Sequence, residues 1–123
     1  DMAEAPKPAE MQGESFLDNL AGDTPWGWKD DCSCRSYVEG GEHATAAWYG
    51  VCTKVDKLVY YYKRNEWEYF DLVTDPEEYT NQYANPKYAK RIAFLTKRLG
   101  ALRQQLDDHD QYQNSGEYNR VDK

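Results

Sequence analysis

The clearest hydrophobic pattern runs from Tyr88 to Leu106, where large apolar residues recur at intervals of four, three, four, three and four. This spacing places them all on one side of an α-helix. The dipeptide Asn85-Pro86 precedes the pattern, and proline is favoured in the first turn of a helix. The pattern therefore predicts a long amphipathic helix whose apolar residues are Tyr88, Ile92, Leu95, Leu99, Leu102 and Leu106.

Three short segments before this helix have the composition of β-strands. Residues 49–53, 58–62 and 67–72 are rich in aromatic and β-branched side chains, and polar turns separate them. Segments of this kind in succession predict a small antiparallel meander. The middle segment carries apolar residues on both faces, whereas a strand with one wet face alternates apolar and polar positions. We therefore expect both faces of the middle strand to be covered.

One helix covers only one face of such a sheet, and the sequence contains no second amphipathic segment of similar length. The other face, with its large aromatic side chains, is expected to be an exposed apolar patch unless another surface covers it. The pattern thus predicts an α+β unit, a small antiparallel sheet of three to four strands with one long C-terminal helix on one face. It also indicates that this unit docks against something larger.

The two ends of the chain are more polar than its centre. Residues 1–47 hold prolines, glycines and charged residues, with one apolar turn at 16–20, and are interpreted as a connector and loop. The loop includes a short predicted strand near Tyr37-Val38. Residues 48–106 form the predicted folded unit. Residues 107–123 lack any hydrophobic period, which predicts a polar, disordered tail.

Composition narrows the classes of function. The 123 residues include 15 Lys and Arg against 22 Asp and Glu, so the formal net charge is −7, and the mean hydropathy is −1.01. Nucleic acid is disfavoured as a partner because phosphate binding needs clustered basic residues. The longest apolar stretch is far shorter than the roughly 20 residues that span a bilayer. The chain opens with Asp1 and no visible secretory signal, which is consistent with removal of an upstream segment.

The three cysteines leave alternatives open. Cys32 and Cys34 are too close in sequence for an ordinary unstrained disulfide, so a bond would join Cys52 to one of them. The remaining thiol would then be free or bonded to another chain. Three reduced thiols are the other interpretation. A zinc site is a weak hypothesis, because only one residue separates Cys32 from Cys34.

Few residues suggest catalytic chemistry. His43 lies in a polar loop before the first predicted strand, and either contacts a substrate or is simply solvated. The run Asp107-Asp-His109-Asp has metal-ligand types, but it follows the helix C-terminus, where a solvated tail is the better interpretation. The aromatic strands could form a sugar-stacking platform, although packing is the more frequent use of such rings. The chain therefore lacks an assembled active site of its own.

Several segments together resemble a known family. These are Lys57-Leu-Val-Tyr-Tyr-Tyr62, Glu66-Trp-Glu-Tyr-Phe-Asp-Leu72, and Asp75-Pro-Glu-Glu78 followed by Asn81. They resemble the C-terminal subdomain of type I sulfatases, and the resemblance covers roughly residues 1–106 with a gap from 23 to 47. Two further segments are similar to family sequences, namely Tyr49-Gly-Val-Cys-Thr53 and Met11-Gln-Gly13-Glu-Ser15 with Leu20 and Gly22.

The resemblance implies a sheet-and-helix subdomain packed on a large, alkaline-phosphatase-like catalytic domain, with residues 1–47 leading from that domain. Family members hydrolyse sulfate esters with a formylglycine, made from Cys or Ser in a Cys/Ser-x-Pro-x-Arg motif, and a divalent cation, usually calcium. Cys32-Ser-Cys34-Arg35 lacks the proline and the arginine spacing of that motif. The resemblance therefore implies a light chain or fragment that is inactive alone. It would complete the fold of a catalytic heavy chain or domain and wall part of the pocket for a sulfated small molecule or glycan.

Within that interpretation, His43, Trp48 and Tyr49 are the predicted substrate-binding residues. Relatives often carry His close to the Tyr-Gly pair, where this chain has Trp48, and Arg before the Thr of the first strand, where it has Cys52. Because the family is usually exported or lysosomal, we expect a secreted, periplasmic or lysosomal location, which would permit a disulfide. The alternative hypothesis is a free-standing secreted module whose aromatic face binds a glycan or a protein.

Overall fold

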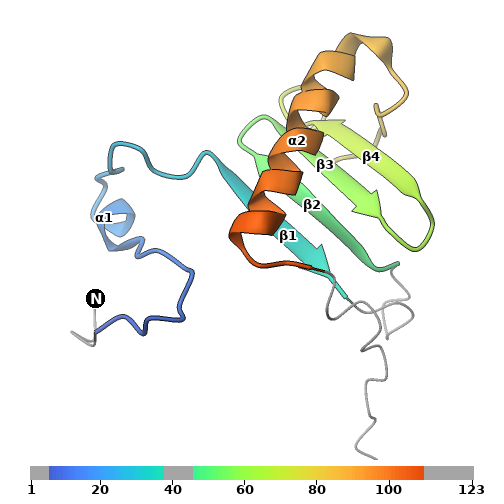
Figure 1. The fold of residues 1–123 in the computed structure, drawn as a ribbon. Helices are drawn as coiled ribbons and strands as arrows, with labels where there is room; N and C mark the ends of the chain where they lie inside the picture. Colours follow the sequence, from blue (N-terminus) through green and yellow to red (C-terminus); the bar gives the residue numbers. More distant parts are fainter. Residues whose placement is uncertain (1–5, 38–45, 110–123) are drawn as a thin grey trace, which may run out of the picture. The chain divides into compact units, whose positions relative to one another are not determined.

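The computed structural model describes residues 6–37 and 46–109 and divides the chain into two units, Asp1–Asp30 and Asp31–Lys123. The first unit contains one helical turn, α1 (Leu17–Leu20), whose apolar residues are exposed. The second is a four-stranded antiparallel sheet in the order β1-β2-β3-β4, with one long helix across one face (Figure 1). Its elements are β1 (Asp31–Ser36), β2 (Trp48–Thr53), β3 (Asp56–Tyr61), β4 (Glu66–Asp71), the 3₁₀ turn η1 (Pro86–Tyr88) and α2 (Ala89–Gln105).

The core lies between α2 and the sheet, as the periodic pattern predicts. Ile92, Leu95, Leu99 and Leu102 are buried against Val51, Leu58 and Tyr69. Asn85 caps the entry to the helix, because its side chain accepts a hydrogen bond from the Lys87 backbone N–H at 3.0 Å. Leu106, the last residue of the predicted apolar series, follows the helix end and is exposed. The prediction of an α+β unit with one covering helix is confirmed.

β1 occupies residues for which the sequence predicted a loop. Its sequence has few β-forming residues, so local preference does not explain the strand. Instead, β1 pairs along the whole of β2, from Asp31 opposite Thr53 to Ser36 opposite Trp48. The folded sheet therefore begins at Asp31 rather than at Trp48.

The outer edge of β4 is closed by the segment that follows it. The Asn81 side chain accepts a hydrogen bond from the Tyr69 N–H and donates one to the Trp67 carbonyl, both at 3.1 Å. The Gln82 N–H donates to the Tyr69 carbonyl at 2.8 Å. These bonds satisfy backbone groups that an edge strand would otherwise offer to another strand. The Asn of the sulfatase-like motif thus has a clear structural role.

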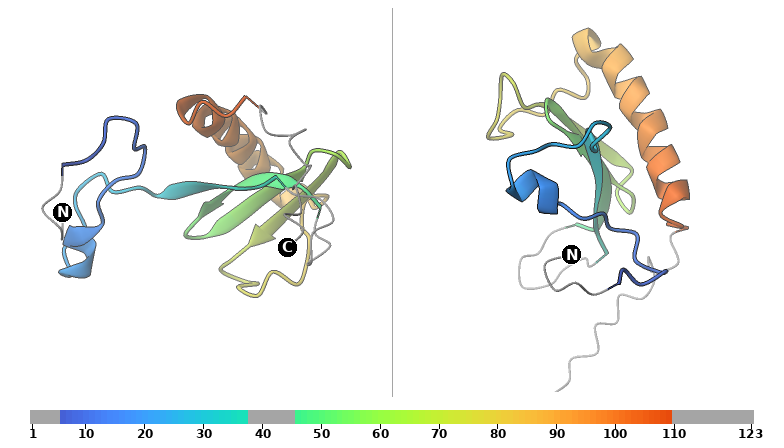
Figure 2. Two further views of the ribbon diagram at one scale, coloured as in Figure 1. Left: turned by 90° about the horizontal axis from the view of Figure 1, so that it is seen from below. Right: turned by 90° about the vertical axis from the view of Figure 1, so that its left-hand side faces the viewer.

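The face of the sheet away from α2 is not the exposed apolar patch that the pattern predicted. Val59 and Phe70, at its centre, are only 3% and 7% exposed. After β4 the chain turns back on this side of the sheet (Figure 2), and Glu78 Oε2 lies 2.6 Å from Lys57 Nζ. Lys57 is the register partner of Phe70, so this ion pair brings the returning segment beside the buried ring. Both faces of the middle strand are covered, as predicted, but the chain itself covers the centre.

Candidate functional site

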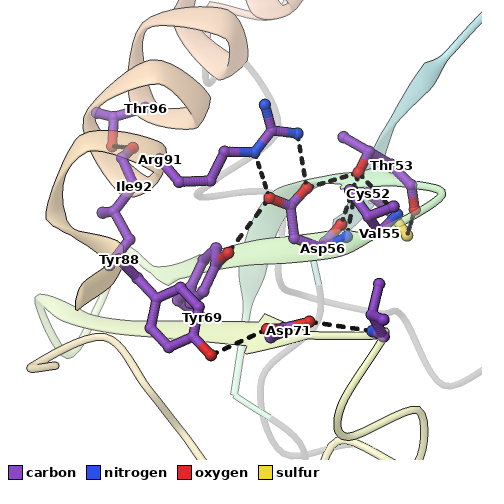
Figure 3. A network of polar contacts seen from close by, with 11 residues as sticks. Cys52, Thr53, Val55, Asp56, Tyr69, Asp71, Tyr88, Arg91, Ile92 and Thr96 are labelled. Atoms are coloured by element: carbon purple, nitrogen blue, oxygen red, sulfur yellow. Dashed lines mark hydrogen bonds and ion pairs between the residues drawn. The ribbon is translucent and has the colours of Figure 1, made fainter.

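A network of polar side chains joins α2 to one end of the sheet (Figure 3). Asp56, only 2% exposed, accepts hydrogen bonds from Arg91, from the Thr53 hydroxyl at 2.5 Å and from the Tyr69 hydroxyl at 3.3 Å. Burial by itself raises the pKa of Asp56, but the bonds from Arg91 and Thr53 outweigh burial and hold this pKa below its usual value. An ionised carboxylate with these contacts is a structural anchor and not a proton donor.

Two further contacts extend the anchor along the helix. The Tyr88 hydroxyl donates to Asp71 at 2.9 Å, and Arg98 donates to both oxygens of Asp31 at 2.5 and 2.9 Å. Hydrogen bonding to Arg98 is the main reason why the pKa of Asp31 is lowered. The sequence analysis did not predict the contacts of Arg91 and Arg98. The signal that could have found them is their spacing of seven residues, which puts Arg91 and Arg98 on one flank of the helix.

Five aromatic side chains form a row on the helix-facing side of the sheet, toward the β3–β4 turn. Tyr60 stacks on Trp67 with ring centroids 4.3 Å apart, and Trp67 stacks on Tyr83 at 5.8 Å with an interplanar angle of 8°. Tyr49 stacks on Tyr62 at 5.7 Å and meets Tyr60 edge-on at 5.4 Å. These five residues are called the aromatic row below. Because its rings stack on one another, the aromatic row shows packing between side chains, and binding of a sugar by these rings stays a prediction.

Two arginines cover one end of the aromatic row. The Arg103 guanidinium lies 4.1 Å from the centroid of the Tyr49 ring, and that of Arg35 lies 5.4 Å from it. Both arginines also bind Asp108, and the Arg103 Nε to Asp108 Oδ2 distance is 3.1 Å. Burial raises the pKa of Asp108, but the hydrogen bonds from the two arginines outweigh burial and lower it. Asp108, predicted to lie in a solvated tail, instead ties the end of α2 to β1.

The predicted substrate-binding residues do not converge on one surface. His43 lies outside the described residues. Trp48 and Tyr49 are consecutive on β2, so they point to opposite faces of the sheet. Tyr49 belongs to the aromatic row, while Trp48 is half-buried on the face away from α2. Their contact with a substrate stays a prediction.

The three cysteines share the face away from α2. Cys32 and Cys34 alternate with Ser33 on β1, and Cys52 lies directly opposite Cys32 on β2. All three thiols are free in the structure, with Cys32 exposed and the other two half-buried. Within residues 6–37 and 46–109, His, Cys, Asp and Glu side chains form no group of three suited to a metal ion. In the same part of the chain, no helix has the length and apolar character needed to cross a bilayer.

Comparison with known proteins shows to which family this chain belongs. The profile of the family described as N-sulphoglucosamine sulphohydrolase, C-terminal, matches residues 1–105. The chain belongs to this family of sulfatase C-terminal domains. The resemblance expected from the strand and Asp-Pro motifs is therefore confirmed, and the sulfatase domain has structural neighbours of the alkaline-phosphatase-like fold.

Individual relatives agree with this assignment. An N-acetylglucosamine-6-O-sulfatase of Bacteroides thetaiotaomicron is 32% identical over 113 residues, which are 89% of this chain and 20% of the relative. An arylsulfatase of Clostridium perfringens is 34% identical over 101 residues, 80% of this chain and 19% of the relative. A solved structure of a protein with its substrate D-glucosamine-2-N,6-O-disulfate has a TM-score of 0.81 and 31% identity, covering 88% of this chain and 22% of its own. The sulfatase domain thus spans about a fifth of these proteins.

Proposed function

We propose that the complete protein containing this domain hydrolyses sulfate esters of a sulfated amino sugar, either free or within a glycan. The domain would be non-catalytic alone, completing the fold and forming part of one wall of the substrate pocket. The observation that carries this proposal is the family match over residues 1–105. The sugar class is taken from the relatives, one named for N-acetylglucosamine-6-O-sulfate chemistry and one solved with a sulfated glucosamine. As a light chain or a fragment, the domain would need a catalytic chain or domain as its partner.

The cofactors would belong to that catalytic portion. There, formylglycine would supply the nucleophile and a calcium ion would balance the charge of the sulfate group. The described residues of this domain offer no group of metal-ligand side chains, and Cys32-Ser-Cys34-Arg35 does not match the formylglycine motif. The domain's own contribution would be packing and shape. Sulfatases of this kind are typically extracellular or periplasmic, and we propose a secreted, periplasmic or lysosomal location for this one.

His43, Trp48 and Tyr49 remain the proposed contacts with the sugar. Because Trp48 and Tyr49 face opposite sides of the sheet, at most one of the two can reach a given bound sugar directly. Tyr49 lies under Arg103 and close to Arg35, so its ring would act mainly by positioning these two cations. We therefore expect His43→Ala and Trp48→Ala to raise KM in the complete enzyme more than Tyr49→Phe does.

A sulfate-release assay on the complete protein tests the proposal. Its substrates are N-acetylglucosamine 6-sulfate, the 2-N,6-O-disulfate of glucosamine and an aryl sulfate. We expect sulfate release from an amino sugar, loss of that release on calcium chelation, and no release by the 123-residue chain alone. Failure to release sulfate from any of these substrates, in protein whose formylglycine is verified by mass spectrometry, would overturn the proposal. Calcium-dependent turnover by the chain alone would contradict its non-catalytic role.

A second function is favoured by one observation, the burial of Val59 and Phe70 within the chain. A sheet whose far side is covered at its centre could persist as a free-standing secreted module that binds a glycan or a protein. In its glycan-binding form, this alternative predicts that the 123-residue chain binds a sulfated amino sugar without a partner. Calorimetric titration of the isolated chain separates the two, because the sulfatase-portion proposal expects no binding by the chain alone.

A further inference from the structure

The three thiols of the domain form a cluster that its proposed function does not use. They lie on the face of the sheet away from α2, on the neighbouring strands β1 and β2. Cys32 Sγ is 3.9 Å from Cys34 Sγ, close enough for contact but without a bond. Once an oxidant has converted one of them into a disulfide, thiols this close can exchange disulfide partners, and the strand geometry determines which pair is favoured.

The register of β1 and β2 distinguishes the possible pairs. Cys32 and Cys52 are directly opposed, and opposed residues of an antiparallel pair have Cα atoms about 4.5–5.5 Å apart, within the range of disulfides. Cys34 is opposed by Gly50, which leaves it diagonal to Cys52 at about 7–8 Å, beyond an unstrained bridge. Cys32 and Cys34, two residues apart on one extended strand, are separated by about 6.5 Å and their short ring would be strained.

Exposure distinguishes the thiols in a second way. Cys32 is exposed, whereas Cys34 and Cys52 are half-buried. Burial is the main reason why the pKa of Cys52 is raised and that of Cys34 is raised to about 11. The exposed member of the opposed pair is therefore the one that an oxidant in solvent reaches first.

We propose that Cys32 and Cys52 form a cross-strand disulfide under oxidising conditions and that Cys34 stays a thiol. With glutathione disulfide as oxidant, the Cys32 thiolate attacks one sulfur to form a mixed disulfide and releases one glutathione. The Cys52 thiolate then attacks the Cys32 sulfur and displaces the second glutathione. Two protein thiols become one S–S bond, and the two electrons reduce glutathione disulfide to two glutathione thiols. The geometry is independent of the proposed sulfatase function, which bears only on whether the natural compartment is oxidising.

The bond would join an edge strand to the rest of the sheet. Among the strands that the structure describes, β1 pairs with β2 alone, and it carries Asp31 and Arg35, which hold α2 and the segment after it. The disulfide would close the loop from residue 32 to residue 52, and closing a loop of this size stabilises a fold mainly by restricting the unfolded chain.

Peptide mapping of the 123-residue chain tests the proposal. The chain is equilibrated with glutathione disulfide, its free thiols are alkylated, and it is digested with trypsin without reduction. We expect the peptide of residues 30–35 to be linked to that of residues 36–54, with fragmentation placing the bond on Cys32 and the alkyl group on Cys34. A bond from Cys34, alkylation of all three thiols or a link between two chains would each overturn the proposal.

Matched serine variants provide an independent measurement. Cys34→Ser should retain the crosslink, and reductant should lower its midpoint of thermal unfolding by on the order of 10 °C, as in the parent chain. Cys32→Ser should lose the crosslink and the effect of reductant. The reverse pattern would contradict the pairing. The map of the parent chain decides the matter even where a variant does not fold.

Discussion

The guanidinium of Arg91 donates two hydrogen bonds to the carboxylate of Asp56 and so joins α2 to β3. Asp56 is almost fully buried, whereas 39% of the Arg91 side chain is exposed. The pair therefore lies at the boundary between core and solvent. Without the carboxylate, Arg91 could turn to water, but the hydroxyls of Thr53 and Tyr69 would lose an acceptor inside the protein.

We predict that Asp56→Ala lowers the free energy of unfolding by about 2–3 kcal/mol. This value is below the full cost of breaking a buried ion pair, because the partly exposed Arg91 guanidinium can be hydrated by water once the carboxylate is removed. Urea denaturation of the 123-residue chain measures the change. Glu77→Ala, which removes an exposed carboxylate of the same unit, is the control and should change stability by less than about 0.5 kcal/mol. Equal losses in the two variants would contradict the anchoring role of Asp56.

Low pH should destabilise the domain over a defined pH range. The pKa values of Asp31, Asp56 and Asp108 are lowered in the folded state, so the unfolded chain binds more protons as the pH falls. Their stabilisation is complete above the ordinary carboxyl pKa of about 4 and is lost as the pH falls through the folded values. The midpoint of thermal unfolding should therefore fall steeply below about pH 4. A midpoint that stays constant from pH 5 to pH 2 would show that these ion pairs do not hold the fold together.

High pH should also destabilise the domain, because two tyrosines have raised pKa values in the folded state. Burial, more than any other cause, raises the pKa of Tyr69 and Tyr61 to about 12. A group with a raised pKa stabilises the fold below its ordinary value and loses this effect as the pH rises through the folded value. Stability should thus decline between about pH 10 and pH 12, and Tyr69→Phe should make the decline shallower. Thermal unfolding followed by circular dichroism across that range checks both points, and an unchanged slope in the variant would exclude Tyr69 as a cause.

Gly50 is required by the close approach of β2 and β3. A Cβ at this position would lie 2.5 Å from the Leu58 carbonyl oxygen and 3.3 Å from the Val59 Cα, both of which are backbone atoms of β3. We predict that Gly50→Ala destabilises the chain by about 1–3 kcal/mol, because the strand must shift. Gly100→Ala is the matched control, since nothing lies within 4 Å of its Cβ. It should stabilise α2 by about 0.5–1 kcal/mol. Chemical denaturation of both variants should give changes of opposite sign, and two changes of the same sign would refute this comparison.

The parts of the fold that follow from local pattern could be predicted. The apolar series that begins at Tyr88 identifies α2, and the aromatic and β-branched segments identify β2, β3 and β4. β1 could not be found in this way, because its Asp, Cys, Ser and Arg residues become a strand only by pairing with β2. Long-range partners such as Asp56 with Arg91 were not predicted either, since the seven-residue spacing of Arg91 and Arg98 places both on one flank of the helix but does not identify the carboxylates that they meet.

For the predicted sugar contacts, prediction from the sequence failed for a different reason. A family resemblance indicates Trp48 and Tyr49 together, yet consecutive strand residues point to opposite faces, which the alternation alone already implies. The far face of the sheet was expected to need a partner surface. That expectation was wrong for its centre because the segment after β4 returns to pair Glu78 with Lys57. A turn that folds back across a sheet leaves no periodic signal.

The proposed function requires this domain to be part of a larger sulfatase. Size-exclusion chromatography of the native protein, with intact mass spectrometry and a sulfate-release assay on each fraction, tests this directly. We predict that the chain elutes within a polypeptide or complex about five times its own 14.4 kDa, because it spans about a fifth of its relatives. Sulfate release from a sulfated amino sugar should coincide with that fraction. A 14.4 kDa monomer, with sulfatase activity in no fraction that contains the chain, would contradict the account.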